Sequence, residues 1–320
     1  MTAFDTEITL TGPFRSPAQM LAAQEYGGHT SIHDSETAGE LGLAGAPIEA
    51  PTHFSQFDPL AALVWGQKWF EHGCISGHFS TMVVEGEQVQ ASLTVGGDVR
   101  YSTAQITAVN ADGATVSSGT ASIGPDHGET ELDARFVRQR PPRELFIIDQ
   151  LEVGMRRSSG EVAVDHVTGN GPLYPFSLDE KLARITEPNP WYTADGGWRS
   201  PWGRAVLPME MISVLAHKVG VGWPLRTPAL GLFLDLEVRL LNGPVFVGQP
   251  YTVETEIVGL GESRRTESYW TRTTLTDAQT GMPVAVVLLH SGMFKESYPG
   301  YPADRLADLR RSEVARRPRA

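Results

Sequence analysis

Two stretches of the sequence carry side chains that could move a proton. In the first, His33 stands beside Asp34 in a polar segment, so the carboxylate could hold the imidazole as a general base. In the second, Glu187 precedes an Asn-Pro pair and Tyr192 follows it. The high reference pKa of tyrosine makes it a proton donor at neutral pH, which a glutamate could complement as a base. We therefore predict catalytic roles for Glu187, Tyr192, His33 and Asp34.

These residues also have explanations that involve no chemistry. His33 could be a surface histidine in a turn, and Glu187 could be a carboxylate that caps a turn, because Asn-Pro is a strong turn signal. Tyr192 could pack against Trp191 and Trp198. At the level of the sequence both explanations stay open.

A loop of small residues follows each polar stretch and leads into an apolar segment. Residues 45–51 in the first half correspond to residues 203–208 in the second. A carboxylate near the start of such a segment could stabilise the helix macrodipole, which is the preferred explanation for Glu210. A histidine or an aromatic cluster near the same point could instead face a ligand. We expect substrate-binding roles for Asn189, His53, Glu49, Trp191, Trp202 and Gly203.

Helix signals place these residues within two similar halves. Ser16 is followed by proline, and Ser177 precedes Glu180 at capping-box spacing, so both serines predict helix starts. Pro59 interrupts the long apolar segment of the first half and predicts a new helix start there. The predicted helices cover residues 16–26, 52–70, 177–185 and 208–219.

Beyond each apolar helix the hydrophobic period changes from helical to alternating. Leucine or valine alternates with a charged residue from 234 to 240, which is typical of a strand with one buried face. Turns that contain glycine then join further alternating segments. The predicted strands are 89–95, 101–109 and 115–123 in the first half, and 234–240, 253–257, 267–275 and 284–289 in the second. Each half is therefore expected to be a helix followed by an antiparallel sheet.

The composition is that of an ordinary globular protein, with 41% hydrophobic and 20% charged residues. A formal net charge of -12 argues against nucleic acid as a partner. The single cysteine, Cys74, excludes an internal disulfide and a thiolate metal cluster. The first residues show no signal-peptide pattern and no apolar run is long enough for a membrane, so we expect a cytoplasmic protein.

A segment rich in proline and arginine separates the two halves. We predict an N-terminal repeat at residues 1–137, a linker at 138–146, a C-terminal repeat at 147–297 and a peripheral tail at 298–320.

A helix wrapped by an antiparallel sheet, present twice, resembles the double-hotdog proteins, an α+β fold. A more specific resemblance is to the MaoC-like enoyl-CoA hydratases and dehydratases. Their motif runs Asp-x-Asn-Pro-x-His, then an acidic residue, an alanine, a glycine-rich turn and Pro-Ile before the helix. Residues 32–34, Ala38 and residues 41–48 follow this pattern, and residues 187–192 follow its Asn-Pro part. The Val-x-Gly-Glu turn at residues 84–87 resembles the strand junction of the family.

The resemblance implies a proton-transfer site in the cleft between the halves. In the family, an aspartate and a histidine orient a water for syn addition to an enoyl thioester, and a backbone N–H at the helix start polarises the thioester carbonyl. His33 matches the histidine, but Gly28 stands at the aspartate position. Pro51, which has no N–H, stands at or next to the oxyanion position. In the second half, Glu187 and Tyr192 occupy the aspartate and histidine positions.

Three functions are compatible with this pattern. The first is a MaoC-like hydro-lyase that acts on an enoyl or 3-hydroxyacyl thioester, with CoA or an acyl-carrier protein as the expected carrier. The broken dyads also allow a thioesterase, or a lyase or cyclase on a non-thioester metabolite. A non-catalytic acyl-binding module is the third. No metal or redox cofactor is implied, and both a homodimer and a pseudo-dimeric monomer fit the resemblance.

Overall fold

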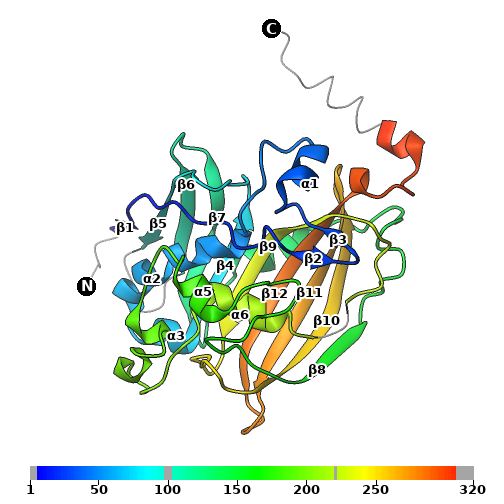
Figure 1. Cartoon of the computed structure of the whole chain (residues 1–320). Coiled ribbons are helices and arrows are strands. Elements are labelled where there is room, and N and C mark those ends of the chain that lie inside the picture. The colour runs from blue at the N-terminus through cyan, green and yellow to red at the C-terminus, as the bar shows by residue number, and fades with distance from the viewer. Residues whose placement is uncertain (1–5, 97–102, 220–221, 308–320) are drawn as a thin grey trace.

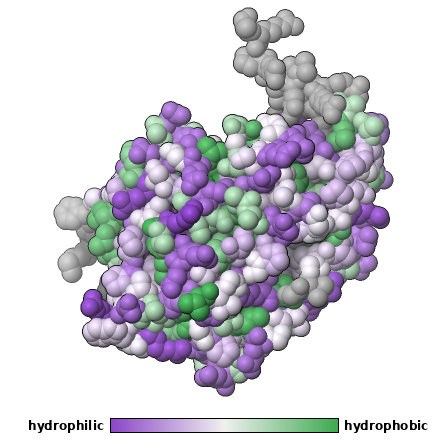
Figure 2. Space-filling model, in the orientation of Figure 1, coloured by the Kyte–Doolittle hydropathy of each residue, from purple (hydrophilic) through white to green (hydrophobic). Residues whose placement is uncertain are grey.

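The computed structural model describes residues 6–96, 103–219 and 222–307. One antiparallel sheet of 10 strands runs through the molecule in the order β1-β5-β6-β7-β4-β9-β12-β11-β10-β8. Figure 1 shows α2, α3, α5 and α6 in front of this sheet. Hydrophilic residues cover much of the face shown in Figure 2, with hydrophobic residues scattered among them. No helix in the described ranges is long and apolar enough to cross a membrane.

The first half supplies β1 and β4 to β7, and its central helical run is broken into three pieces. Its strands are β1 (Ile8–Thr11), β2 (Glu25–Tyr26), β3 (His29–Thr30), β4 (Gly73–Phe79), β5 (Val89–Val95), β6 (Ala104–Asn110) and β7 (Thr115–Ile123). Its helices are α1 (Ser35–Glu40), η1 (Ala50–Gln56), α2 (Asp58–Trp65), α3 (Lys68–His72) and α4 (Glu131–Arg138).

The second half has longer strands and a single, short central helix. Its strands are β8 (Arg156–Val162), β9 (Gly231–Leu240), β10 (Tyr251–Glu262), β11 (Thr266–Asp277) and β12 (Pro283–Phe294). Its helices are α5 (Leu178–Leu182), η2 (Pro190–Tyr192), η3 (Gly197–Arg199), α6 (Met209–Ala216) and η4 (Lys295–Ser297).

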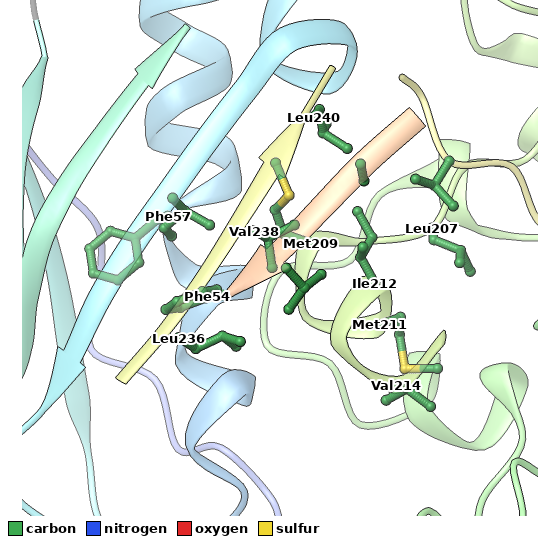
Figure 3. Close-up of a cluster of buried hydrophobic side chains, with 14 of the residues drawn as sticks. Phe54, Phe57, Leu207, Met209, Met211, Ile212, Val214, Leu236, Val238 and Leu240 are labelled. Atoms are coloured by element: carbon green, nitrogen blue, oxygen red, sulfur yellow. The ribbon is translucent and has the colours of Figure 1, made fainter. Parts of the chain in front are cut away.

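Strands β4 and β9 join the two half-sheets into one. They pair antiparallel from Cys74 opposite Arg239 to His78 opposite Asp235. Helix α4 anchors to this joint, because the Thr130 hydroxyl at its N-cap donates to Glu237 Oε2 at 2.6 Å. The hydrophobic core is continuous across the joint. In Figure 3, Phe54 and Phe57 lie on one side of the β9 residues, and Ile212 lies on the other.

The strand predictions agree well with the structure, because β5 alternates strictly in burial and a glycine turn precedes β7. The predicted strand 115–123 coincides with β7, and 89–95 coincides with β5. The Ser177–Glu180 capping box is confirmed at the start of α5. The first two residues of the predicted strand 101–109 and most of the predicted tail lie outside the described residues.

The predicted helix at residues 16–26 is wrong. Arg15 instead exchanges two backbone hydrogen bonds with Val89 on β5, at 2.8 Å each. The Gln19 side-chain oxygen Oε1 then accepts hydrogen bonds from the N–H groups of Met20 and Leu21, at 3.0 and 2.9 Å. These local bonds replace those of a helix, so a good capping sequence starts an irregular segment along the sheet.

Candidate active site between the two halves

A cavity of about 780 Å³ lies between the two halves. This volume is within the usual range for a small-molecule site. Residues of the first half around His33 and Glu49 line one side, and the inner face of β9 to β12 lines the other. Its shape follows from element lengths, since α6 has 8 residues whereas β10, β11 and β12 have 12 each. Such a helix spans about 12 Å and such strands about 40 Å, so α6 covers part of the sheet.

His33 is presented to this cavity with one ring nitrogen committed to the protein. Its Nδ1 lies 2.6 Å from the carbonyl oxygen of Pro47. Because a carbonyl oxygen only accepts, Nδ1 carries the proton and the lone pair of the neutral ring is on Nε2. Burial lowers the pKa of His33 more than the Pro47 hydrogen bond raises it. At neutral pH the side chain is therefore an uncharged base.

Asp34, the predicted partner of His33, has a different position. It is the N-cap of α1, and its Oδ1 accepts from the Thr37 N–H and hydroxyl, each at 2.9 Å. These hydrogen bonds lower the pKa of Asp34. The carboxylate is thus engaged in starting a helix, and the geometry favours a structural role for it.

Glu49 and His53 also line the cavity, at the start of the first central helix. Glu49 is buried, and burial raises its pKa although Lys181 opposes the shift. Burial and the nearby Lys181 lower the pKa of His53 to about 4, so its imidazole is neutral. Among the described residues, His53 Nδ1 and Glu49 Oε1 have no hydrogen-bond partner.

Lys181 ties this part of the site to the second half. Its Nζ lies 2.9 Å from Glu210 Oε2 and 3.5 Å from Glu49 Oε2, and it donates to the Thr52 hydroxyl at 2.8 Å. All four side chains are buried. Burial raises the pKa of Glu210 to about 7 against the attraction of Lys181. Nothing in the sequence marks Lys181, because a lysine in the last turn of a helix is normally exposed.

Glu187, Asn189 and Tyr192 lie together, but around a separate pocket of about 80 Å³ beside α2. Glu187 pairs with Arg15 at 2.6 and 3.2 Å. The Asn189 Oδ1 accepts from the Trp191 N–H at 2.9 Å and caps η2. The turn is thus capped by Asn189, whereas Glu187 is engaged in an ion pair with the first half.

Tyr192 is buried, and its hydroxyl donates to Asp58 Oδ2 at 3.1 Å. Trp69 Nε1 donates to the other oxygen of Asp58 at 2.9 Å. Burial raises the pKa of Asp58 to about 6 even though these hydrogen bonds lower it. Nothing in the sequence marks Asp58 beyond its place before Pro59.

Trp191 and Trp202 pack against Phe70, which lines the same small pocket. The Trp191 ring lies 5.3 Å from that of Phe70 and 5.8 Å from that of Trp202. Trp202 Nε1 donates to Glu71 Oε1 at 3.1 Å. Gly203 is in an exposed turn with a φ of 67°. The described residues that line the large cavity include none of Trp191, Trp202 and Gly203.

This chain has a double-hotdog fold. It is similar to a MaoC domain protein described as a dehydratase from Chloroflexus aurantiacus, with a TM-score of 0.55 and 14% identity, over 91% of this chain and 95% of that one. It is also similar to a conserved Mycobacterium tuberculosis protein with a double hotdog fold, with a TM-score of 0.50 and 12% identity, over 82% of this chain and 86% of that one.

The double-hotdog prediction is confirmed by these two structures. No protein-family model matches the sequence, and no curated protein does.

Proposed function

We propose that this protein is a hydro-lyase that adds water to an enoyl thioester, or removes it from a 3-hydroxyacyl thioester, in the cavity between the two halves. The observation that carries the proposal is His33, a neutral imidazole with its lone pair on Nε2, at a cavity large enough for an acyl group. The fold shared with a MaoC domain protein described as a dehydratase supports the same reaction class.

In this proposal His33 handles both proton transfers. Its Nε2 accepts a proton from water as the water oxygen bonds to Cβ of the enoyl group. The electron pair of the double bond moves onto the thioester carbonyl and gives an enolate. The proton on Nε2 then passes to Cα on the same face, so the net change is syn addition of one water.

The start of η1 supplies a hydrogen bond to the enolate oxygen. Pro51 is the second residue of η1 and cannot donate. Ala50, the first residue, lines the cavity, and an N–H at this position has no partner within its own helix. Ala50 can therefore replace the donor that Pro51 removes, an interaction typically worth about 3 kcal/mol of barrier.

The buried cluster of Lys181, Glu49, Thr52 and Glu210 holds this donor in place. Lys181 connects Glu49 and Thr52, on either side of Ala50 and Pro51, to Glu210 on α6. Buried charged side chains need their partners, so a buried ion pair permits few other arrangements of the elements that carry it. We assign the cluster a positioning role, because its members fix η1 of one half against α6 of the other.

The test is His33→Gln, with His72→Gln as the matched control. His72 also directs Nδ1 at a backbone carbonyl, that of Leu241 at 3.0 Å, and the described cavity lining does not include it. With a panel of 2-enoyl-CoA substrates, His33→Gln is expected to lower kcat/KM by roughly 100-fold or more, and His72→Gln to change it little. A folded His33→Gln variant with wild-type turnover would refute the assignment.

A lyase, cyclase or thioesterase on a different substrate is the second candidate. One observation favours a non-thioester metabolite: the described lining residues include no lysine or arginine, and Glu49 is their one carboxylate. Such a cavity suits a neutral compound. Binding of uncharged ring compounds without binding of enoyl-CoAs would favour this candidate, whereas ligand binding without any turnover would favour the acyl-binding module.

A further inference from the structure

The floor of the cavity carries a row of hydroxyl groups. Tyr269, Thr271 and Thr273 alternate along β11, so their side chains share one face of the sheet. Thr255 on β10 and Ser291 on β12 extend the row to the neighbouring strands, and all of these residues line the cavity. This hydroxyl row, defined by these residues, is not explained by the proton-transfer site.

The corresponding face of the first half has a different composition. Ala104, Ile106 and Ala108 alternate along β6, the counterpart of β11 in the strand order, and are all buried. Valine and threonine have nearly the same shape, so packing alone does not require hydroxyls on β11. A buried hydroxyl without a partner costs free energy, and a purely alkyl ligand would leave that cost uncompensated.

The protein satisfies the hydroxyl row only in part. Thr255 Oγ1 and Thr273 Oγ1 lie 2.9 Å apart, so one donates to the other and the second hydroxyl proton is not used within the pair. The residues opposite Thr271 are Ile257 on β10 and Leu289 on β12, whose side chains offer no hydrogen bond. Thr271 and Thr273 are therefore available to a ligand in the cavity.

The other groups around the cavity favour a neutral ligand. Burial lowers the pKa of His33, His53 and His217, so these side chains are uncharged at neutral pH. Burial raises the pKa of Tyr269 to about 12, which keeps its hydroxyl protonated. The described lining contains no lysine or arginine to balance an anion. Hydroxyls both donate and accept, so they match a hydroxyl or keto oxygen.

Strand register gives the order of the row along β11. The Tyr26 hydroxyl accepts a hydrogen bond from the Gly231 N–H, and Gly231 is opposite Met293 on β12. From that end, Ser291 and Tyr269 come first, and Thr271 and then Thr273 follow. A ligand that contacts both Tyr269 and Thr273 must therefore span four residues of β11, about 13 Å.

We infer that the hydroxyl row selects a substrate whose acyl chain or ring carries a neutral oxygen, a hydroxyl or keto group, in addition to its thioester. Thr271 and Thr273 are the specificity-determining residues. The inference rests on the proposed function only for the reaction, because the recognition it describes can be measured as binding.

The experiment compares two probes by isothermal titration calorimetry: the N-acetylcysteamine thioesters of octanoate and of 7-hydroxyoctanoate. The wild-type protein is expected to bind the hydroxylated probe at least tenfold more tightly. The double variant Thr271→Val, Thr273→Val should bind the two probes within about threefold of each other, since it keeps the shape and loses the hydroxyls. Thr274→Val, on the opposite face of β11, is the control and should keep the preference.

Equal affinity of the wild-type protein for the two probes, absence of binding of both, or a preference that survives in the double variant would each overturn the inference. His33→Gln separates this result from the reaction. If that variant keeps wild-type turnover but the preference disappears with Thr271 and Thr273, the reaction assignment fails and the recognition stands. If His33→Gln abolishes turnover but the probes bind equally, the reverse holds.

Discussion

The two halves share a topology but fill their interiors differently. In the first half, η1, α2 and α3 extend from Ala50 to His72 over strands β4 to β7 of 7 to 9 residues. In the second half, α6 ends at Ala216 beneath strands of 10 to 12 residues. The first interior is packed with large side chains such as Trp69, and the second holds the cavity.

This difference explains why the two copies of the motif are not equivalent. The copy with His33 faces the incompletely filled second half, where the cavity is about 780 Å³. The copy with Glu187 and Tyr192 faces α2 of the filled half, where the space is about 80 Å³. A repeat can thus keep its motif in both positions while only one position has room for a substrate.

The largest expected effect concerns the cluster that joins the halves. Lys181→Met would leave Glu49 and Glu210 buried without their cation. Breaking a buried ion pair in this way typically costs about 3 to 5 kcal/mol. Urea unfolding should show this loss, and adding Glu49→Gln and Glu210→Gln to the variant should recover part of it. A loss below about 1 kcal/mol, the range of exposed pairs, would contradict the positioning role.

A pH effect of up to roughly 3 kcal/mol is expected from Glu210, at about 1.4 kcal/mol per pKa unit. Burial raises its pKa from 4.5 to about 7, so between these values the folded protein keeps a proton that the unfolded chain has lost. The free energy of unfolding due to Glu210 should therefore fall as pH rises through this window and be constant above it.

The difference in unfolding free energy between the wild type and Glu210→Gln isolates this contribution. His53, whose pKa is lowered to about 4, has the opposite effect between pH 4 and 6.5, but it is present in both proteins. A difference that does not change between pH 4.5 and 7 would contradict the account of Glu210.

Replacing one buried alanine in each half by leucine should show that the first half is fully packed and the second is not. Ala61 is 0% exposed in the packed half, so Ala61→Leu should cost about 1 to 3 kcal/mol by overpacking. Ala216 lines the cavity, so Ala216→Leu should cost less than Ala61→Leu and should weaken ligand binding instead. Chemical denaturation and a binding titration measure the two effects. Equal destabilisation by both substitutions would show that the second half is as filled as the first.

The smallest effect is expected at the small pocket. Glu187→Gln removes a partly exposed pair with Arg15 and should cost about 0 to 1 kcal/mol, with turnover within about twofold of wild type. Steady-state kinetics provide the check. Complete loss of turnover in a folded Glu187→Gln variant would show that Glu187, and not His33 alone, is required for catalysis.

The sequence predicted the parts of this molecule that depend on local pattern. Strict alternation identified β5, and the spacing of the motif pointed to His33, which lines the cavity. The helix predicted at residues 16–26 failed because Gln19 bonds locally and Arg15 pairs with a distant strand. No local pattern shows that Lys181 is buried, since its partners come from both halves.

The family resemblance implies a cleft between the halves, but the size of the cavity could not be predicted from the sequence. That size depends on how far α6 extends beneath β10 to β12, a comparison between elements distant in the chain. Motif spacing likewise did not indicate which half each copy faces. For this reason the sequence offers Glu187, Tyr192 and His33 together as catalytic candidates, although the structure separates them into two pockets.

A crystal structure with a saturated acyl-CoA, which cannot be hydrated, tests the central claim most directly. The account predicts acyl carbons between α6 and β11, with Cα and Cβ of the thioester next to His33 Nε2 and the carbonyl oxygen at the Ala50 N–H. An acyl chain bound instead in the pocket lined by Glu187 and Tyr192 would contradict it.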